Sequence, residues 1–424
     1  MEQPKENKMG TMPVNKLLVT MSLPMVISMI LQALYNIVDS IFVSRLSEDA
    51  LTAVSMAFPM QNLMIGVAGG VGVGTNALLS RALGEGRHEE ADKMAVQGIF
   101  ITACSYIIFL AIGLFFAREF FVIQGANEVI ADYGYDYLSV ILIISFGCLF
   151  QMIFERLLQA TGRTFYSMIT QGTGAIINII LDPIFIFWLD MGVKGAALAT
   201  VLSQACSAVW VLSFLFSRRA SLPLERRYMK LEKSIVLSML ALGVSPFIMA
   251  STESLVGFVL NSSLKEFGDI YVSALTVLQT SMQFASVPLT GFAQGFVPVA
   301  SYNYGHGDKR RVKECFRIAL ITMFSFNLVL MLFMIGFPAI VASAFTSDTR
   351  LIETVRWTMP VFLGGMTIFG LQRACQNMFV ALGQARISIF IALLRKVILL
   401  IPLALILPHF MGVAGVYAAE AISD

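Results

Sequence analysis

The segment MGVKGAALA at Met191–Ala199 returns as MGVAGVYAA at Met411–Ala419, an offset of 220 residues (191 to 411). Further matches lie at nearly the same offset. They pair Ser80–Gly86 with Ser301–Gly307, Gln159–Gly162 with Val380–Gly383, Met60-Gln61 with Met282-Gln283, and Pro24 with Pro246. A recurrence at one period over most of a chain indicates a duplicated structural unit. The sequence therefore predicts two related halves.

The composition indicates that lipid, not water, surrounds this chain. Of its 424 residues, 57% are hydrophobic and 13% are charged, and the mean hydropathy is +0.78. Soluble domains carry about 25% charged residues. The net charge of +2 gives no indication of nucleic-acid binding. We expect a polytopic membrane protein whose partner is the lipid bilayer.

Twelve apolar runs match the length of a membrane-spanning helix, about 20 residues, except for the last, which is too short. They are residues 17–44, 52–79, 94–116, 134–159, 165–189, 194–217, 235–261, 272–300, 316–345, 353–381, 384–408 and 412–424. The predicted fold is all-α, with two pseudo-symmetric six-helix lobes and a twelfth helix that is incomplete in this chain. We expect an N-terminal lobe at 1–217, a basic cytoplasmic linker at 218–234 and a C-terminal lobe at 235–424.

Lysine and arginine gather in alternate loops. The longest and most basic of these loops runs from about Ser217 to Ser234, and the polar N-terminus lies on the same side. Short basic loops stay in the cytoplasm. The N-terminus is therefore expected to be cytoplasmic, and the even number of helices in each half inserts both halves the same way round, with a substrate route between them.

Four polar residues of the first half are expected at a similar depth in the outer part of the membrane. Asp39 lies in the first run, Asn178 and Asp182 share one face of the fifth run at spacing i, i+4, and Thr200 lies in the sixth. Ionised carboxylates inside the membrane have a high free-energy cost, so their presence there indicates a functional role. Their oxygens suit Na⁺ or a shared proton, although structural hydrogen bonding between helices is the alternative.

The proline that follows this cluster and the matching positions of the second half strengthen the prediction. Pro183 cannot donate a backbone hydrogen bond, so it disturbs the turn around Asp182 and frees carbonyl groups there. By the repeat, Asp39 corresponds to Asn261 and Asp182 to Ile401. Because the second half lacks both carboxylates, the fold does not require them, and we expect the first lobe to hold the coupling ion.

Other polar and aromatic side chains are candidates for contact with substrate. Glu155 could attract a cation or form a structural ion pair with an arginine, and Glu253 is a second candidate acid. In an inter-lobe cavity, Gln61, Met282, Gln283 and Phe284 would suit flat aromatic cations. Arg395 and Lys396 could extend to the membrane interface.

Several functional classes lack their sequence markers. The chain contains no GxxxxGK[ST] phosphate loop, so no ATP site is expected. We find no catalytic grouping and no metal-binding motif, and we expect neither an enzyme nor a cofactor. A membrane scaffold or sensor would be expected to carry an appended soluble domain, and the sequence shows none.

These motifs together resemble the multidrug and toxic compound extrusion (MATE) family in its bacterial branch. The resemblance covers about 15–424 and is carried by Leu23-Pro24, Asp39, Ser80–Gly86, Glu155-Arg156 with Gln159–Gly162, Asn178–Pro183 and Gly192–Ala197. It implies two lobes in a V that alternate between inward and outward openings, and a bend in the first helix at Pro24. It also implies a cation site at Asp39, Asn178, Asp182 and Thr200. An acid expected in the tenth helix, near Leu371-Gln372, is absent.

The resemblance predicts a transporter of the bacterial cytoplasmic membrane, acting as a monomer. It would export small organic cations, such as drugs and dyes, in exchange for H⁺ or Na⁺. The alternative is a flippase for lipid-linked saccharides or lipids, which shares a related helical plan. A flippase is expected to have more basic residues in its cavity, whereas the predicted intramembrane cluster is acidic.

Overall fold

The computed structural model describes residues 7–217, 228 and 231–423, except for the side chains of residues 250, 253 and 254. Most of the predicted linker at 218–234 and the side chain of Glu253 therefore lie outside the described residues. Within the described part the secondary structure is helical, without strands.

The first half contains α1 (Lys8–Thr11), α2 (Val14–Ser44), α3 (Glu48–Gly84), α4 (His88–Phe115), α5 (Ala117–Ile123), α6 (Glu128–Ile143), α7 (Phe146–Ala160), α8 (Thr164–Pro183), the π-helix η1 (Ile184–Trp188) and α9 (Gly192–Leu215). The second half contains α10 (Lys233–Lys265), α11 (Asp269–Gly305), α12 (Lys309–Gly336), α13 (Pro338–Ser343), α14 (Thr349–Gly364), the 3₁₀-helix η3 (Gly365–Ile368), α15 (Phe369–Ala381), α16 (Ala385–Leu393), the π-helix η4 (Leu394–Leu400), α17 (Ile401–Ile406), α18 (Pro408–Met411) and α19 (Val413–Ser423).

The duplication read from the sequence is present in the helices. The pairs α3 and α11 have 37 residues each, α4 and α12 have 28 each, and α6 and α14 have 16 each. The repeated motifs share glycines with positive φ at matching positions, namely Gly86 (73°) and Gly307 (79°), Gly162 (80°) and Gly383 (73°), and Gly192 (54°) and Gly412 (59°). Side chains with a Cβ rarely adopt this conformation, so the matching turns explain the matching glycines.

The helices are long and apolar enough for a membrane. In the described part, seven helices could cross a bilayer, or eight if α6 and α7, bent by 44°, form one span. The predicted run 316–345 is wrong as a single helix, because α12 ends at Gly336 and Pro338 begins α13. A proline is favoured at the first position of a helix, where its missing N–H costs nothing. A break at the matching place of the first half separates α4 from α5, although α5 begins with Ala117 and not with a proline.

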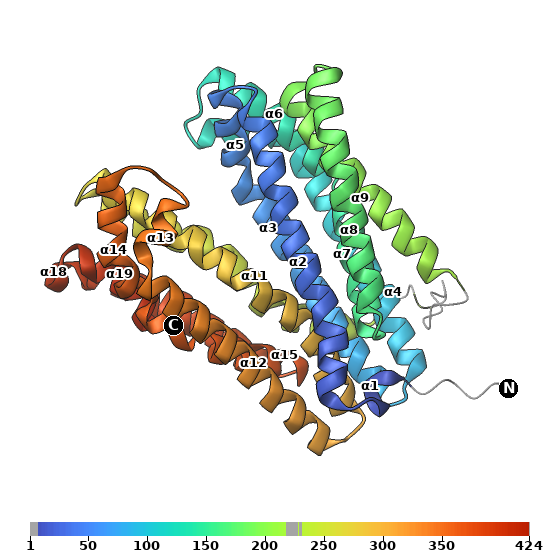
Figure 1. The fold of residues 1–424 in the computed structure, drawn as a ribbon. Coiled ribbons are helices and arrows are strands. Elements are labelled where there is room, and N and C mark those ends of the chain that lie inside the picture. Colours follow the sequence, from blue (N-terminus) through green and yellow to red (C-terminus); the bar gives the residue numbers. More distant parts are fainter. Residues whose placement is uncertain (1–6, 218–227, 229–230, 424) are drawn as a thin grey trace.

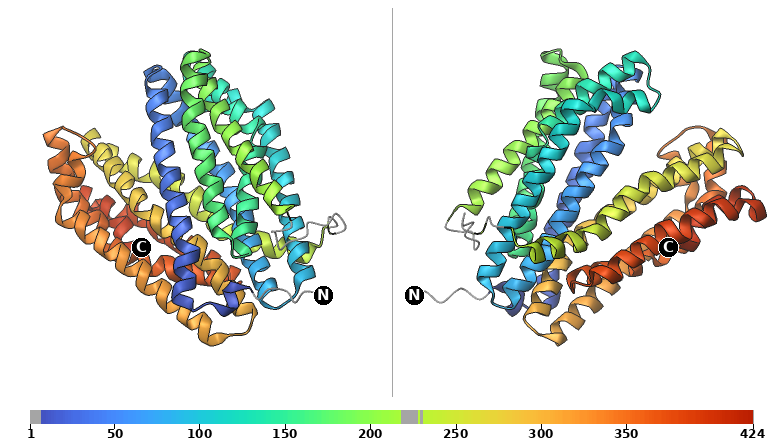
Figure 2. Two further views of the ribbon diagram at one scale, coloured as in Figure 1. Left: turned by 45° about the vertical axis from the view of Figure 1, so that its right-hand side comes forward. Right: turned by 180° about the vertical axis from the view of Figure 1, so that it is seen from behind.

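The two halves form two diverging bundles. Figure 1 shows the blue-to-green helices of the first half in one bundle and the orange-to-red helices of the second half in another, and both views of Figure 2 show the same V. The bundles converge where α1 lies and diverge toward the ends that carry α5 and α13. Many large apolar side chains remain exposed on the helices, as expected for surfaces that face lipid, including Ile107, Phe115 and Val329.

Glycine pairs join the two bundles where they converge. On α3, Gly70 and Gly74 lie against α10, and on α11, Gly291 and Gly295 lie against α2. A Cβ at Gly74 would lie 2.1 Å from the Met239 carbonyl oxygen. Small residues spaced four apart let helix backbones approach this closely in membranes. The repeat thus builds two equivalent crossings, each between one helix of either half.

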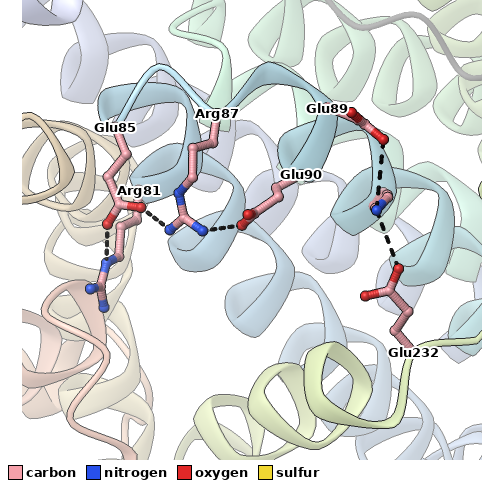
Figure 3. A network of polar contacts seen from close by, with 7 residues as sticks. Arg81, Glu85, Arg87, Glu89, Glu90 and Glu232 are labelled. Atoms are coloured by element: carbon pink, nitrogen blue, oxygen red, sulfur yellow. Dashed lines mark hydrogen bonds and ion pairs between the residues drawn. The ribbon is translucent and has the colours of Figure 1, made fainter.

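Polar contacts cover the converging end. Figure 3 shows Arg81 and Arg87 bonded to Glu85, and Arg87 also to Glu90. Glu232, just before α10, lies 3.4 Å from the Lys93 ammonium of α4 and so links the two halves.

The short helix α1 also bridges the two halves at this end. On one side, the guanidinium of Arg311 in α12 donates to the carbonyls of Met9 (3.0 Å) and Met12 (2.8 Å). On the other side, atoms of Asn7, Lys8 and Met9 lie against Gly162. The converging end is therefore tied together by side chains of both lobes.

Candidate functional site

Three of the four predicted cation ligands are joined by hydrogen bonds. The Asn178 amide nitrogen donates to Asp182 Oδ1 at 3.3 Å and to Thr200 Oγ1 at 3.4 Å. Asn178 and Asp182 are fully buried on α8, and Thr200 reaches them from the neighbouring α9. The i, i+4 spacing thus puts both residues on the face that meets α9.

Asp39 belongs to the same cluster. It lies on α2, which packs along α8, and its carboxylate is close enough to repel that of Asp182 electrostatically. The phenol of Tyr137 on α6 lies within electrostatic range of both carboxylates. It accepts a hydrogen bond from the Gln61 amide at 3.1 Å. Tyr137 was not predicted as a site residue, since a lone tyrosine in an apolar run carries no distinguishing signal.

The cluster contains three buried oxygens without a hydrogen-bond partner among the described protein atoms. They are Asp39 Oδ1, Asn178 Oδ1 and Asp182 Oδ2. Buried oxygens are rarely left unpaired, and each one costs about 1–3 kcal/mol. Carboxylate and amide oxygens are the ligands that hard cations prefer. The geometry therefore provides acceptors that a Na⁺ ion or protons on the carboxylates would satisfy.

Local backbone structure changes directly beside this cluster. Helix α8 ends at Pro183, immediately after Asp182, and continues as the π-helix η1. Proline lacks the N–H that would continue the ladder, and single π-turns are frequent at functional sites. In α2 the helix continues through Pro24, and the Thr20 carbonyl, four residues before it, accepts a hydrogen bond from Thr164 Oγ1 at 3.4 Å. The bend predicted at Pro24 stays a prediction.

A cavity of about 520 Å³ lies between the two bundles. Helices of both halves line it, and glycines of α3 form part of one wall. The volume falls in the range of small-molecule sites, about 300–1,000 Å³. Its charged lining residues are Glu155, Arg156 and Arg373. The cavity is thus not acidic, contrary to the expectation drawn from the cluster, because the carboxylates of Asp39 and Asp182 lie outside its lining.

Glu155 is fixed by amides and not by an arginine. Its two carboxylate oxygens accept hydrogen bonds from Gln151 Nε2 at 2.9 Å and Gln171 Nε2 at 2.8 Å. Arg156 donates instead to Gln159 Oε1 at 3.0 Å. Of the ion pairs between described residues, none involves Glu155.

The other predicted substrate contacts lie elsewhere. The cavity lining does not include Gln61, Met282, Gln283 or Phe284. Gln61 bonds to Tyr137, and Met282 packs against the apolar core of the second half. Gln283 and Phe284 are exposed on α11. The sequence pattern could not place these side chains, since a helix-wide mixture of Met, Phe and Gln does not show which face meets the other lobe.

The second lobe contains a different kind of buried charge. The Lys396 ammonium and the Glu420 carboxylate, nearly inaccessible to solvent, lie 3.0 Å apart between η4 and α19. Arg395 is buried over the ring of Phe369, 4.7 Å from its centroid. These side chains are enclosed by the lobe, so the expectation that Arg395 and Lys396 extend to the interface is wrong.

A family model reproduces the duplicated architecture. The MatE model matches residues 24–184 and again residues 246–406, which together cover most of the chain. The chain belongs to the MatE family. The two matches begin at Pro24 and Pro246, one of the residue pairs that the sequence repeat had matched.

Curated MatE relatives cover nearly the whole chain. "Multidrug export protein MepA" of Staphylococcus aureus strain MRSA252 is 25% identical over 413 residues, 97% of this chain and 91% of the relative. The protein of the same description from Staphylococcus haemolyticus strain JCSC1435 is 24% identical over 410 residues, covering 96% and 90%. The chain is therefore similar to bacterial multidrug export proteins along nearly its whole length.

Solved MATE structures share the fold. A crystal structure of MATE in complex with MaL6 superposes with a TM-score of 0.92 at 26% identity, covering 99% of this chain and 95% of that one. A multidrug resistance MATE family transporter in an outward-facing conformation gives a TM-score of 0.91 at 26% identity, with coverage of 100% and 95%. This MatE protein is accordingly a multi-pass membrane transporter of two helical lobes.

Proposed function

We propose that this protein is a secondary antiporter that exports small organic cations in exchange for H⁺ or Na⁺. The observation that carries the proposal is the group of three unpaired buried oxygens on Asp39, Asn178 and Asp182. A small cation that binds there cancels the repulsion between the two carboxylates. Membership of the MatE family, together with similarity to a multidrug export protein, supports the outward direction of transport and the type of substrate.

The proposed cycle uses the two lobes as alternating gates. In the inward-open form a substrate enters the cavity between the lobes. The lobes then rock about the glycine crossings, and the cavity opens outward. A proton or Na⁺ binds Asp39 and Asp182 beside the cavity, favours release of the substrate and returns the protein to its first state. Either ion can shift the equilibrium between the inward-open and outward-open forms only if it binds one form more tightly than the other.

The proposed setting is the bacterial cytoplasmic membrane. Lys8, Arg81, Arg163 and Arg311 all lie near the converging end of the V. The positive-inside rule would place that end in the cytoplasm, together with the N-terminus. On this orientation the bundles diverge toward the outside. Monomeric transport without ATP, nucleic acid or a cofactor remains part of the proposal.

A measurement of dye efflux in cells tests the coupling role. Asp39→Asn and Asp182→Asn keep the size of each side chain and remove its charge, and each is expected to abolish net efflux. Asp132→Asn is a matched control, since Asp132 is exposed and pairs with the exposed Arg118. Full efflux in both cluster variants would refute the proposal.

A lipid-linked saccharide flippase remains the second candidate. The observation in its favour is that the cavity contains two arginines, Arg156 and Arg373, for one glutamate. Guanidinium groups suit phosphates. The similarity of this chain to multidrug export proteins favours efflux over flipping. Reconstituted vesicles that move a labelled lipid-linked sugar, and no cationic dye, would favour the flippase.

A further inference from the structure

Two cations at the converging end of the V lie next to each other without an acidic partner among the described residues. Lys8 of α1 lies against Gly162, where a Cβ would be 3.3 Å from Lys8 Cε, and Arg163 is the next residue in the turn between α7 and α8. Burial, and then the nearby Arg163 guanidinium, lower the pKa of Lys8. No ion pair between described residues includes either side chain. The repulsion between the two cations is therefore not offset by a carboxylate in this part of the chain.

Other cations at the same end are either paired or open to water. The paired ones bond to glutamates or to carbonyls of α1, and they are Arg81, Arg87, Lys93 and Arg311. Lys309 and Arg386 are exposed, so water can solvate them. Lys8 and Arg163 differ from both groups, because they are partly buried and their side chains donate no hydrogen bond to a described residue. Partly buried cations without an acceptor indicate a site for an anion.

The fold does not require a cation at position 163. At the repeat offset of 221 residues, Gly162 corresponds to Gly383 (162 to 383), and Arg163 to Gln384. The second lobe therefore makes the same positive-φ turn with a neutral residue. The cation beside Gly383 is Arg81, whose Nη1 would lie 3.5 Å from a Cβ there, and it pairs with Glu85 at 2.9 Å. Charge is balanced beside one turn and unbalanced beside the other.

Aromatic side chains surround Arg163 at the ends of two membrane-spanning helices, α8 and α9. The guanidinium lies over the ring of Phe214, 5.6 Å from its centroid. Phe214 in turn contacts Tyr166 at 4.4 Å and Trp210 at 6.1 Å between ring centroids. Phe165, beside Tyr166, is 56% exposed. Aromatic rings gather at the level of the lipid headgroups. The two cations thus lie where a headgroup can reach them from the bilayer.

We propose that Lys8 and Arg163 bind the phosphate of an anionic phospholipid, whose acyl chains lie along the aromatic side chains of α8 and α9. One phosphate can accept hydrogen bonds from both cations. The first turn of α8 has no acidic residue and no side-chain cap, so the positive end of the helix adds to the attraction. A diffusible phosphate would match the cations but not the exposed aromatic surface. The bound lipid would tie α1 to the first lobe, opposite the contact of α1 with Arg311.

Quenching of tryptophan fluorescence by brominated lipids measures this preference. The chain has three tryptophans, and Trp188→Phe with Trp357→Phe leaves Trp210 beside the proposed site. The full chain is reconstituted in phosphatidylcholine bilayers with a rising fraction of brominated phosphatidylglycerol, or of brominated phosphatidylcholine as the reference lipid. We expect phosphatidylglycerol to bind about 25-fold more tightly than the reference lipid, from about fivefold for each cation.

Charge-removing variants test the two residues. Lys8→Gln and Arg163→Gln should each lower the ratio of the two binding constants about fivefold, and the double variant should abolish the preference. Arg163→Lys keeps the charge and should retain most of it. The matched control is Lys309→Gln with Arg386→Gln, which removes two exposed cations of the same end and should leave the ratio unchanged. A loss of folding would alter quenching by both lipids and not their ratio.

Three results would overturn the proposal. The first is equal binding of the two lipids by the protein with Lys8 and Arg163 intact. The second is a double variant that keeps the full preference, or a control that loses as much, since the basic surface as a whole would then attract the lipid. The third is loss of the preference in millimolar inorganic phosphate, which would show that the two side chains hold a diffusible anion and not a lipid.

Discussion

The two lobes share one helical plan but treat buried charge differently. In the first lobe, oxygens of Asp39, Asn178 and Asp182 are buried and unpaired. In the second lobe, Lys396 and Glu420 form a direct ion pair at 3.0 Å. One lobe retains acceptors that a mobile cation can satisfy, and the other neutralises a carboxylate with a fixed lysine. The difference teaches that duplication supplies the helical frame, whereas a few side chains decide how each lobe satisfies its buried charge.

The largest expected effect comes from breaking the fixed pair. Glu420→Gln leaves the Lys396 ammonium buried without its carboxylate, which costs about 3–5 kcal/mol in comparable buried pairs. We expect a clear fall in the thermal unfolding temperature of the detergent-solubilised protein. The double variant with Lys396→Met removes the stranded charge and should recover part of the loss. An unchanged unfolding temperature in Glu420→Gln would show that the pair is not needed for stability.

The glycine crossings test whether the two halves are mechanically equivalent. Gly74→Ala would bring a Cβ to 2.1 Å from the Met239 oxygen, and Gly295→Ala to 2.5 Å from the Ser22 Cα. The helices must then separate, at a cost of about 1–3 kcal/mol. Both variants should lower the unfolding temperature by similar amounts. A large effect of one and none of the other would show that the crossings are not equivalent.

Two buried asparagines, one in each lobe, are expected to have different roles: Asn178 as a cation ligand and Asn327 as a structural hydrogen-bond donor. Asn178 donates to side chains of the cluster, whereas Asn327 in the second lobe donates to the carbonyls of Met366 (2.8 Å) and Thr367 (3.1 Å). Asn178→Ala should slow dye transport about tenfold, or about 1.4 kcal/mol in activation free energy. Asn327→Ala should lower the unfolding temperature more than the transport rate of the protein that remains folded. The reverse pattern would contradict the assignment of roles.

The smallest effect is expected at the surface of the converging end. Lys93 and Glu232 link the two halves at 3.4 Å, but Glu232 is exposed and Lys93 is partly exposed to solvent. Exposed ion pairs are screened by salt and contribute little. Glu232→Gln should leave transport and unfolding temperature nearly unchanged at physiological salt. A marked slowing would instead identify this contact as part of the gate between the lobes.

Repetition and hydropathy made most of the fold predictable. Twelve apolar runs and the repeated motifs predicted the helices and the two halves, because lipid requires long apolar helices and a duplicated unit repeats its sequence at one offset. The break at Pro338 was missed, since a proline inside an apolar run does not show whether the chain kinks or starts a new helix. The pairing of Lys396 with Glu420 depends on the contact of η4 with α19, which no local pattern encodes.

The site was predictable only where spacing fixed the geometry. Asn178 and Asp182 share a helix face by their separation, and the structure brings them to Thr200 as expected. The polarity of the cavity was not predictable. It depends on which face of α7 and α15 meets the space between the lobes, and that is a tertiary property of the two bundles.

The most direct test of the central claim is ion-driven transport by the full chain in proteoliposomes, with Na⁺ and pH gradients imposed separately. If the first-lobe cluster is the coupling site, one gradient drives dye accumulation by the wild-type protein. Asp39→Asn and Asp182→Asn should then still exchange dye for dye without responding to either gradient. Gradient-driven accumulation at the wild-type rate in both variants would contradict the claim.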